Sequence, residues 1–258
     1  MQLNKQERSE LLHQLVNMGE NMIACGGEVS RVEGTLIRMG NAYGALRMNV
    51  LVITASMVIT MFFPDHTELT ETRRLEDNAT HNYQRLEAYN ALSRECCRKP
   101  LSIAELTRRI EALENGEAPS RVEFYVGSVL AAGAFAVFFG GNLWDGLAAA
   151  IFALFICFLQ EKLPHLCSGK FIYNTLIALL SGFLISLVCL WIPALHQDKI
   201  IIGDIMLLIP GIAMTGAVRD ILVGDTITGL LRLVEALLWA GGLAIGFMIA
   251  LALAGAIV

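Results

Sequence analysis

Five ionisable side chains stand between two apolar runs near the carboxyl end of the chain. They are Arg219, Asp220, Asp225, Arg232 and Glu235. Charged groups at the edge of hydrocarbon are costly, so their presence there indicates a site for a substrate or an ion. An arginine suits a carboxylate because its planar guanidinium can bind both oxygens at once. The pattern therefore predicts that this stretch recognises a small polar solute.

A predicted helix break precedes the charged stretch, because Pro210 and Gly211 lie inside an apolar run. A break frees backbone carbonyls, which is tolerated at membrane depth only against protein or a wet cavity. Polar residues beside a broken helix are typical of transporter sites. A competing interpretation makes both arginines cytoplasmic flanks and the two aspartates helix caps. For single residues the two interpretations are evenly matched, whereas the cluster as a whole favours function.

The composition separates the chain into two halves. Of its 258 residues 55% are hydrophobic and 17% are charged, against about a quarter charged in soluble domains. Most of the charge lies within residues 1–121, and residues 122–258 are almost entirely apolar. We therefore predict a membrane protein, with a cytosolic α+β domain over 1–120 followed by an all-α bundle of five transmembrane helices over 121–258. The net charge of −5 argues against nucleic acid as a partner.

The first half shows clear periodicity. Apolar spacing predicts helices over 5–25, 29–43, 82–97 and 102–113, and alternation predicts strands over 46–52, 57–63 and 67–76. Ser30 with Glu33, and Ser102 with Glu105, have the spacing of capping boxes. Residues 115–120 have the composition of a linker. No basic and apolar signal stretch opens the chain, so this half is expected in the cytoplasm.

Catalytic chemistry is not indicated in the first half. His13, His66 and His81 lack metal-ligand spacing, and neither a phosphate-binding glycine loop nor a nucleophile motif occurs. The six cysteines show no CxxC spacing, which favours reduced packing residues over disulfides or zinc ligands. Cys25 lies beside Gly26 and is interpreted as a buried cysteine at a helix end rather than a reactive thiol. We expect no enzyme activity, no cofactor and no metal.

The second half contains five predicted spans. They cover about 124–141, 143–159, 171–192, 200–217 and 230–258. With the amino terminus inside, the cytoplasmic flanks hold Arg121, Lys162, Lys170, Arg219 and Arg232, and the opposite side holds only Lys199. This bias satisfies the positive-inside rule. It predicts a multi-pass protein of the cell membrane with a cytoplasmic amino terminus and an extracytoplasmic carboxyl terminus.

Three spans carry polar residues. The third has Asn174 on a face of small residues, the fourth has Asp204, and the fifth places Arg232 and Glu235 one turn apart. Each feature has a plain alternative: small residues pack helices closely, Asp204 near the outer end can be solvated, and an i,i+3 pair can be a local ion pair. Together they favour an aqueous path for a small solute.

Two stretches resemble the threonine/serine exporter family. One joins Pro210-Gly211 to Ala217-Val218-Arg219-Asp220-Ile221-Leu222-Val223-Gly224-Asp225 and to Thr228-Gly229-Leu230-Leu231-Arg232-Leu233-Val234-Glu235-Ala236. The other is Gly26-Gly27-Glu28-Val29-Ser30-Arg31-Val32-Glu33, with Arg38 and Ala42-Tyr43-Gly44. The similarity covers nearly the whole chain, in the family's order of a cytosolic domain before the spans.

The resemblance implies efflux of a small polar metabolite. Family members of the split type pair a longer subunit, which this chain resembles, with a shorter membrane subunit, and are associated with dicarboxylates such as succinate. Fused members are associated with threonine and serine. The motif positions carried over are Pro210, Gly211, Arg219, Asp220, Gly224, Asp225, Arg232 and Glu235, with Glu28, Arg31 and Glu33 as the motif of the cytosolic domain.

The resulting hypothesis is an exporter subunit that works in the lipid bilayer with a shorter membrane subunit. Arg219 or Arg232 attracts the carboxylate of a dicarboxylate or an amino acid. Asp220, Asp225 or Glu235 balances that charge or carries a coupled proton. Five spans are few for a carrier built from two repeats, so a partner is expected. The alternatives are a sensor domain or a hydrolase domain in the cytosol, tethered by the spans.

Overall fold

The computed structural model describes residues 3–53, 56–75, 82–116, 120–165, 167 and 169–256. His81 and residues 117–119 of the predicted linker at 115–120 lie outside these residues. The chain forms two compact units. Unit 1 contains Met1–Ala118 together with Arg219–Gly229, and unit 2 contains Pro119–Val218 together with Leu230–Val258.

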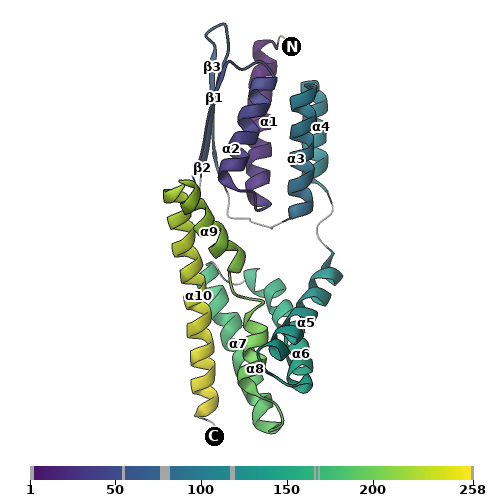
Figure 1. The fold of residues 1–258 in the computed structure, drawn as a ribbon, viewed down its shortest axis with the longest axis vertical. Coiled ribbons are helices and arrows are strands. Elements are labelled where there is room, and N and C mark those ends of the chain that lie inside the picture. The colour runs from purple at the N-terminus through teal and green to yellow at the C-terminus, as the bar shows by residue number, and fades with distance from the viewer. Residues whose placement is uncertain are drawn as a thin grey trace. The chain divides into compact units, whose positions relative to one another are not determined.

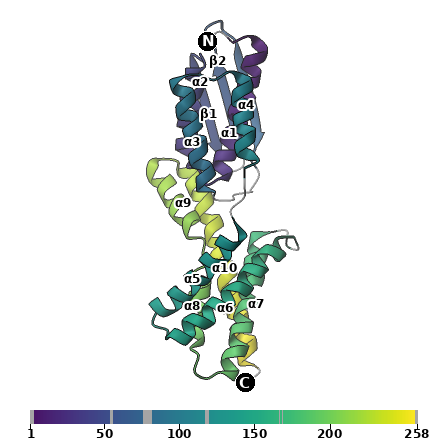
Figure 2. The ribbon, with the colours of Figure 1, turned by 90° about the vertical axis from the view of Figure 1, so that its right-hand side faces the viewer.

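Unit 1 has three layers (Figure 1). Its elements are α1 (Lys5–Ala24), α2 (Val29–Ala42), β1 (Arg47–Ile53), β2 (Ser56–Phe62), β3 (Glu68–Arg74), α3 (Tyr83–Arg98) and α4 (Ile103–Glu114). Helices α1 and α2 cover one face of the sheet, and α3 and α4 pack on the other side of these two helices. Figure 2 shows the strands behind the helices from the perpendicular direction. The predicted helices and strands are confirmed to within two residues at their ends.

The sheet is antiparallel in the order β1-β2-β3. Alternation decides which face is buried, because successive side chains of a strand point to opposite sides. In β2 the buried residues are Met57, Ile59 and Met61, and the residues between them are half-buried. The buried face meets α1 and α2 in a core that also contains Leu15 and Leu36.

The helix ends of unit 1 follow local chemistry. Ser102 caps α4 by accepting from the N–H of Glu105, as predicted, but the Glu105 carboxylate accepts from Arg108 and Arg109 rather than completing a capping box. The predicted cap at Ser30 is wrong, because α2 begins at Val29 and Ser30 is already inside the helix. The residue that flanks the helix start is Glu28. Gly26 ends α1 at φ +91°, a conformation that favours glycine. Cys25 beside it is buried, and burial raises the pKa of its thiol, which fits a packing role.

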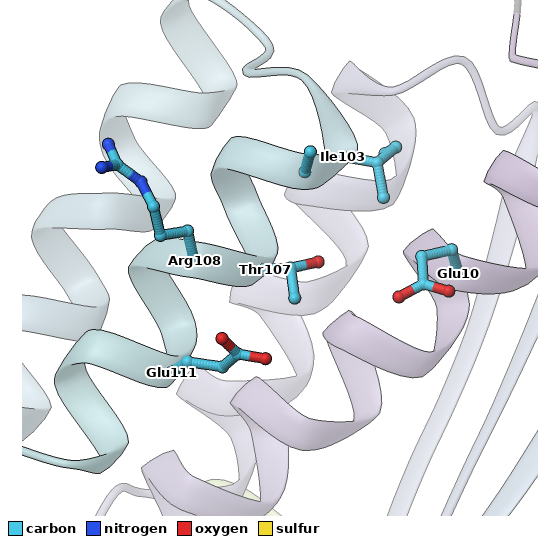
Figure 3. A pocket seen from close by; sticks show the side chains of 6 residues that line it. Glu10, Ile103, Thr107, Arg108 and Glu111 are labelled. Atoms are coloured by element: carbon cyan, nitrogen blue, oxygen red, sulfur yellow. The ribbon is translucent and has the colours of Figure 1, made fainter.

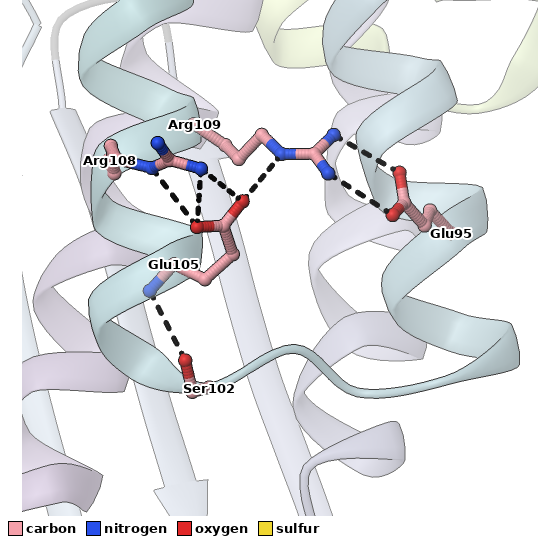
Figure 4. A network of polar contacts seen from close by, with 5 residues as sticks. All are labelled: Glu95, Ser102, Glu105, Arg108 and Arg109. Atoms are coloured by element: carbon pink, nitrogen blue, oxygen red, sulfur yellow. Dashed lines mark hydrogen bonds and ion pairs between the residues drawn. The ribbon is translucent and has the colours of Figure 1, made fainter.

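A salt-bridge network links α3 and α4 on the surface (Figure 4). Glu105 accepts from Arg108 and Arg109, and Arg109 also reaches Glu95 on α3 at 3.4 Å. Hydrogen bonds from the two arginines lower the pKa of Glu105 to about 2. Because the groups are exposed, we expect this network to orient the two helices more than to stabilise them.

Unit 2 is helical in its described residues. It contains α5 (Arg121–Phe138), α6 (Leu143–Lys162), a short 3-10 turn (Leu163–His165), α7 (Lys170–Trp191), α8 (Gln197–Ile205), the first part of α9 (Gly211–Val223) and most of α10 (Thr226–Gly255). Among the residues that the structure describes, four helices are long and apolar enough to cross a membrane: α5, α6, α7 and α10. They correspond to four of the five predicted spans.

The predicted fourth span is not one helix. Residues 206–210 are turns and irregular backbone between α8 and α9, and Pro210 ends this break. Proline lacks the N–H that would continue the helical ladder. The break itself was predicted at Pro210-Gly211, but its consequence, two short helices instead of a span over 200–217, was not.

Glycines allow the helices of unit 2 to approach closely. A side chain on Gly203 of α8 would meet the carbonyl of Ala132 on α5 at 2.6 Å. A side chain on Gly242 of α10 would meet the carbonyl of Phe171 on α7 at 2.9 Å. Small residues of α7 and the GxxxG of α10 therefore lie where helices pack closely. Close packing was the alternative to a solute path for both patterns.

Candidate functional site

Unit 1 brings the two motifs of the chain together. The turn between α9 and α10 belongs to this unit, as part of Arg219–Gly229. This segment carries Arg219 and Asp220 at the end of α9 and Asp225 just before α10. In the same unit Glu28 lies just before α2, and Glu33 lies in the second turn of that helix. Residues almost 200 positions apart in sequence therefore form one acidic and basic cluster.

Arg219 is the centre of this cluster. Its guanidinium lies 3.5 Å from the carboxylate of Glu28 and 3.7 Å from that of Asp220. Glu28 and Asp220 are largely buried, whereas the side chain of Arg219 is 51% exposed. Half of the Arg219 side-chain surface thus remains accessible to solvent, although its charge is balanced by protein carboxylates.

Glu28 is shared between several donors. Arg31 lies 3.0 Å from it across one turn of α2, and the hydroxyl of Ser30 donates to its other oxygen at 3.1 Å. Arg31 itself is 84% exposed. Ser30 was predicted to cap the helix. Its hydroxyl instead orients Glu28, the glutamate that pairs with Arg219.

A cavity of about 370 Å³ lies beside the cluster. It is lined by Ser30, Glu33, Val50, Leu51, Val52, Ile53, Val223, Gly224, Asp225, Ile227 and Thr228. Two carboxylates, those of Glu33 and Asp225, contribute to a lining that is otherwise mostly apolar. A cavity of this size is in the range of small-molecule sites.

Glu33 is held in place by the edge strand of the sheet. Its carboxylate accepts from the backbone N–H of Val52 in β1 at 2.9 Å. Burial raises the pKa of Glu33, the Val52 N–H opposes this shift, and the negative charge of Asp225 adds to it. A carboxyl with a raised pKa in a cavity is a candidate for binding or releasing a proton.

A second cavity, of about 390 Å³, lies between α1 and α4. It is lined by Glu10, Ile103, Ala104, Thr107, Arg108 and Glu111. Figure 3 shows Glu10 on α1 across from Thr107 and Glu111 on α4. None of the predicted motif residues lines it, so the cavity that Glu33 and Asp225 line is the stronger candidate.

The remaining predicted site residues belong to unit 2. Arg232 is half-buried and Glu235 is exposed on α10, and Asn174 is half-buried on α7. Asp204 on α8 is fully buried, so the alternative of a solvated outer aspartate is wrong. Beside them the ammonium of Lys170 lies 4.6 Å from the ring centre of Trp239, a cation–π contact between α7 and α10.

A polar group of unit 2 was missed in the sequence. Asp145 of α6 is fully buried and accepts from the backbone and ring nitrogens of His196 at 2.8 and 3.0 Å. It also accepts from the N–H of Asn142, which completes a capping box. The Asn-x-x-Asp spacing was a readable signal for that cap, but the pairing with His196 needs the fold.

Metal binding finds no support among the residues that the structure describes, because they contain no group of three histidine, cysteine or acidic ligands. The arrangement instead offers a basic group for a carboxylate and acids for an ammonium group or a proton. These are the groups that a carrier of small charged solutes requires.

The comparison with known families gives one match. A family model described as "Putative threonine/serine exporter" matches residues 13–254, nearly the whole chain. No curated protein and no solved structure matches the chain.

Proposed function

The chain belongs to the threonine/serine exporter family, and from that premise we propose that it is one subunit of a carrier that exports small carboxylate-bearing metabolites. The observation that supports this most is the convergence of both family motifs on Arg219, whose side chain is half exposed and pairs with Glu28, the partner of Ser30 in the cavity lining. The membrane helices and the transporter family agree with a multi-pass exporter. The solute and the partner subunit are part of the proposal.

Arg219 receives the carboxylate of the solute in this proposal. Its two protein partners lie at 3.5 and 3.7 Å, longer than the 2.7–2.9 Å of a tight charge-assisted hydrogen bond. A solute carboxylate can therefore form shorter, bidentate bonds than those that the guanidinium already makes. Asp220 and Glu28 would then orient the arginine.

The charge of the cavity separates the candidate solutes. The two acids in its lining, Glu33 and Asp225, attract an ammonium group and repel a second carboxylate. Threonine and serine carry an ammonium group, and succinate does not. This balance favours the amino acids, and a dicarboxylate remains the second candidate.

The partner follows from the size of the membrane domain. Four candidate spans with one broken segment are fewer than a two-repeat carrier contains. We therefore propose that a shorter, purely membrane subunit supplies the second half of the path, and that the chain alone gives no flux.

The test is counterflow in proteoliposomes that contain this chain with and without the shorter subunit, preloaded with threonine, serine or succinate. We expect saturable flux of at least one solute that needs both subunits. Arg219→Gln should abolish it, because the amide keeps hydrogen bonding and loses the charge, while insertion and yield are unchanged. Arg232→Gln tests the second arginine in the same way.

The matched control is Arg94→Gln, which removes an exposed arginine that pairs with Glu87 on the surface of α3. This variant should transport at the unaltered rate. Full flux in Arg219→Gln would remove the arginine from the mechanism. If none of the three solutes is transported, the proposed export of these solutes is wrong. If this chain transports a solute without the shorter subunit, the proposed need for a partner subunit is wrong.

A further inference from the structure

Asp204 is an unusual residue for the interior of unit 2. Its side chain is fully buried on α8, and neither carboxyl oxygen has a hydrogen-bond partner among the described residues. Nearly all buried polar groups in proteins are paired. Asp145 shows the ordinary case in the same unit, because its equally buried carboxylate accepts three hydrogen bonds. The isolation of Asp204 therefore calls for an explanation.

The surroundings of Asp204 are apolar on the side of α5. The neighbouring Gly203 packs against Ala132 and Ala136, which brings α8 close to that helix. From α6, the titratable group within electrostatic range is the thiol of Cys157, which is hydrogen-bonded to Ser128. No charged side chain of α5, α6 or α7 is seen to act on the Asp204 carboxyl within the described part of the chain.

An ionised carboxylate in such a place is costly. Burial of a charge without a donor costs free energy on the order of the whole stability of a small domain. A neutral carboxyl costs far less. The packing of α5, α6 and α8 therefore suits the protonated form. Loss of the proton would favour an arrangement in which water reaches the group.

We propose that Asp204 binds and releases the proton that is coupled to export, so that its protonation closes the α5–α6–α8 bundle and its ionisation opens it. This rests on the proposed function for the coupling, but not for the proton binding itself. In each cycle one proton passes from water on the outer side to the carboxylate, giving a neutral carboxyl. It is released to water on the cytoplasmic side when the bundle opens.

A metal cation is a poorer occupant of this place. Hard cations take about six oxygen ligands. One carboxylate, with no hydrogen-bond partner among the described residues, does not supply them. The chemistry that remains for a lone buried carboxyl is the uptake of a proton.

The first test is independent of transport. Dicyclohexylcarbodiimide, an apolar reagent for protonated carboxyl groups, is added to the membrane-embedded full chain at pH 6 and at pH 9, and labelled peptides are identified by mass spectrometry. We expect label on Asp204 that is lost in Asp204→Asn, and no label on Asp198, the exposed acid of the same helix. A chain without label on Asp204 at either pH would overturn proton binding.

The second test addresses coupling, in proteoliposomes that contain both subunits and an internal pH dye. Asp204→Asn is expected to insert and fold, since it mimics the neutral carboxyl, and to retain solute exchange. It should lose solute-driven proton movement. Asp198→Asn should keep both. Proton movement that persists in Asp204→Asn would overturn the coupling role, whereas an absence of exchange in the unaltered protein would count against the proposed function instead.

Discussion

At the scale of single residues, Arg219 and Glu33 differ in their exposure and in the charges that surround them. Arg219 is half exposed and has two carboxylates within 4 Å, so its charge is balanced before any solute arrives. Glu33 is held by one backbone N–H and faces the charge of Asp225. The arginine is therefore suited to binding, and the glutamate is suited to titration.

Substitution of Glu33 tests its environment through stability. Its pKa in the folded chain is raised above the ordinary value of 4.5. Its contribution to stability is thus fully present below that value and is lost as the pH rises through the folded pKa. We expect Glu33→Gln to gain stability relative to the unaltered chain as the pH increases from 4.5, measured by thermal unfolding in detergent.

The control for this prediction is Glu87→Gln, which removes a carboxylate from the exposed surface of α3. It should not reproduce the pH-dependent gain. A constant difference between Glu33→Gln and the unaltered chain over the same pH range would show that burial does not shift the pKa of Glu33.

At the scale of elements, helix packing in unit 2 depends on where glycines lie. Gly242 faces α7, whereas a Cβ on its neighbour Gly241 would point into open space, with no atom within 4 Å. Two adjacent residues of one helix, with the same intrinsic helix propensity, therefore differ only in what surrounds them. This pair separates the effect of packing from that of propensity.

We expect Gly242→Ala to destabilise the bundle by about 1–3 kcal/mol, because the added carbon forces α7 and α10 apart. Gly241→Ala should be neutral or stabilising, since alanine forms helix more readily than glycine does. The measurement is the melting temperature of both variants in detergent. Equal effects of the two substitutions would show that the α7–α10 contact does not form in the folded chain.

At the scale of the whole molecule, the number of membrane crossings decides the side on which the chain ends. Within the described part of the chain four helices are long enough to cross alone, and α8 and α9 flank the break at residues 206–210. The α9–α10 turn groups with the amino-terminal domain. We therefore expect α8 and α9 to complete one crossing together, which gives five.

This expectation places the carboxyl terminus outside and the amino terminus in the cytoplasm. Alkaline phosphatase fused after the last residue should be active, because the enzyme folds only outside the cytoplasm, and a fusion after Glu114 should be inactive. Green fluorescent protein at the same positions should give the reverse pattern. An inactive carboxyl-terminal phosphatase with a fluorescent counterpart would mean that α8 and α9 do not cross.

Local pattern was sufficient for most elements. Strand alternation around Met57 and helical spacing around Leu36 depend on neighbours a few residues away, so they could be predicted without the fold. The cap at Ser102 was predictable for the same reason. The cap at Ser30 was not, because Glu28 offers the hydroxyl a competing partner that is itself held by Arg219.

The sequence by itself determined the elements of the first half, the four apolar segments that form helices long enough to cross a membrane, and the position of the charged motif, because hydrophobicity and spacing are properties of short segments. Only the tertiary structure decided that Arg219 meets Glu28, that Asp225 shares a cavity with Glu33, and that Asp204 is buried with no hydrogen-bond partner among the described residues. These facts depend on contacts between distant segments, and the environment of a charged group is set by such contacts rather than by its own residue type.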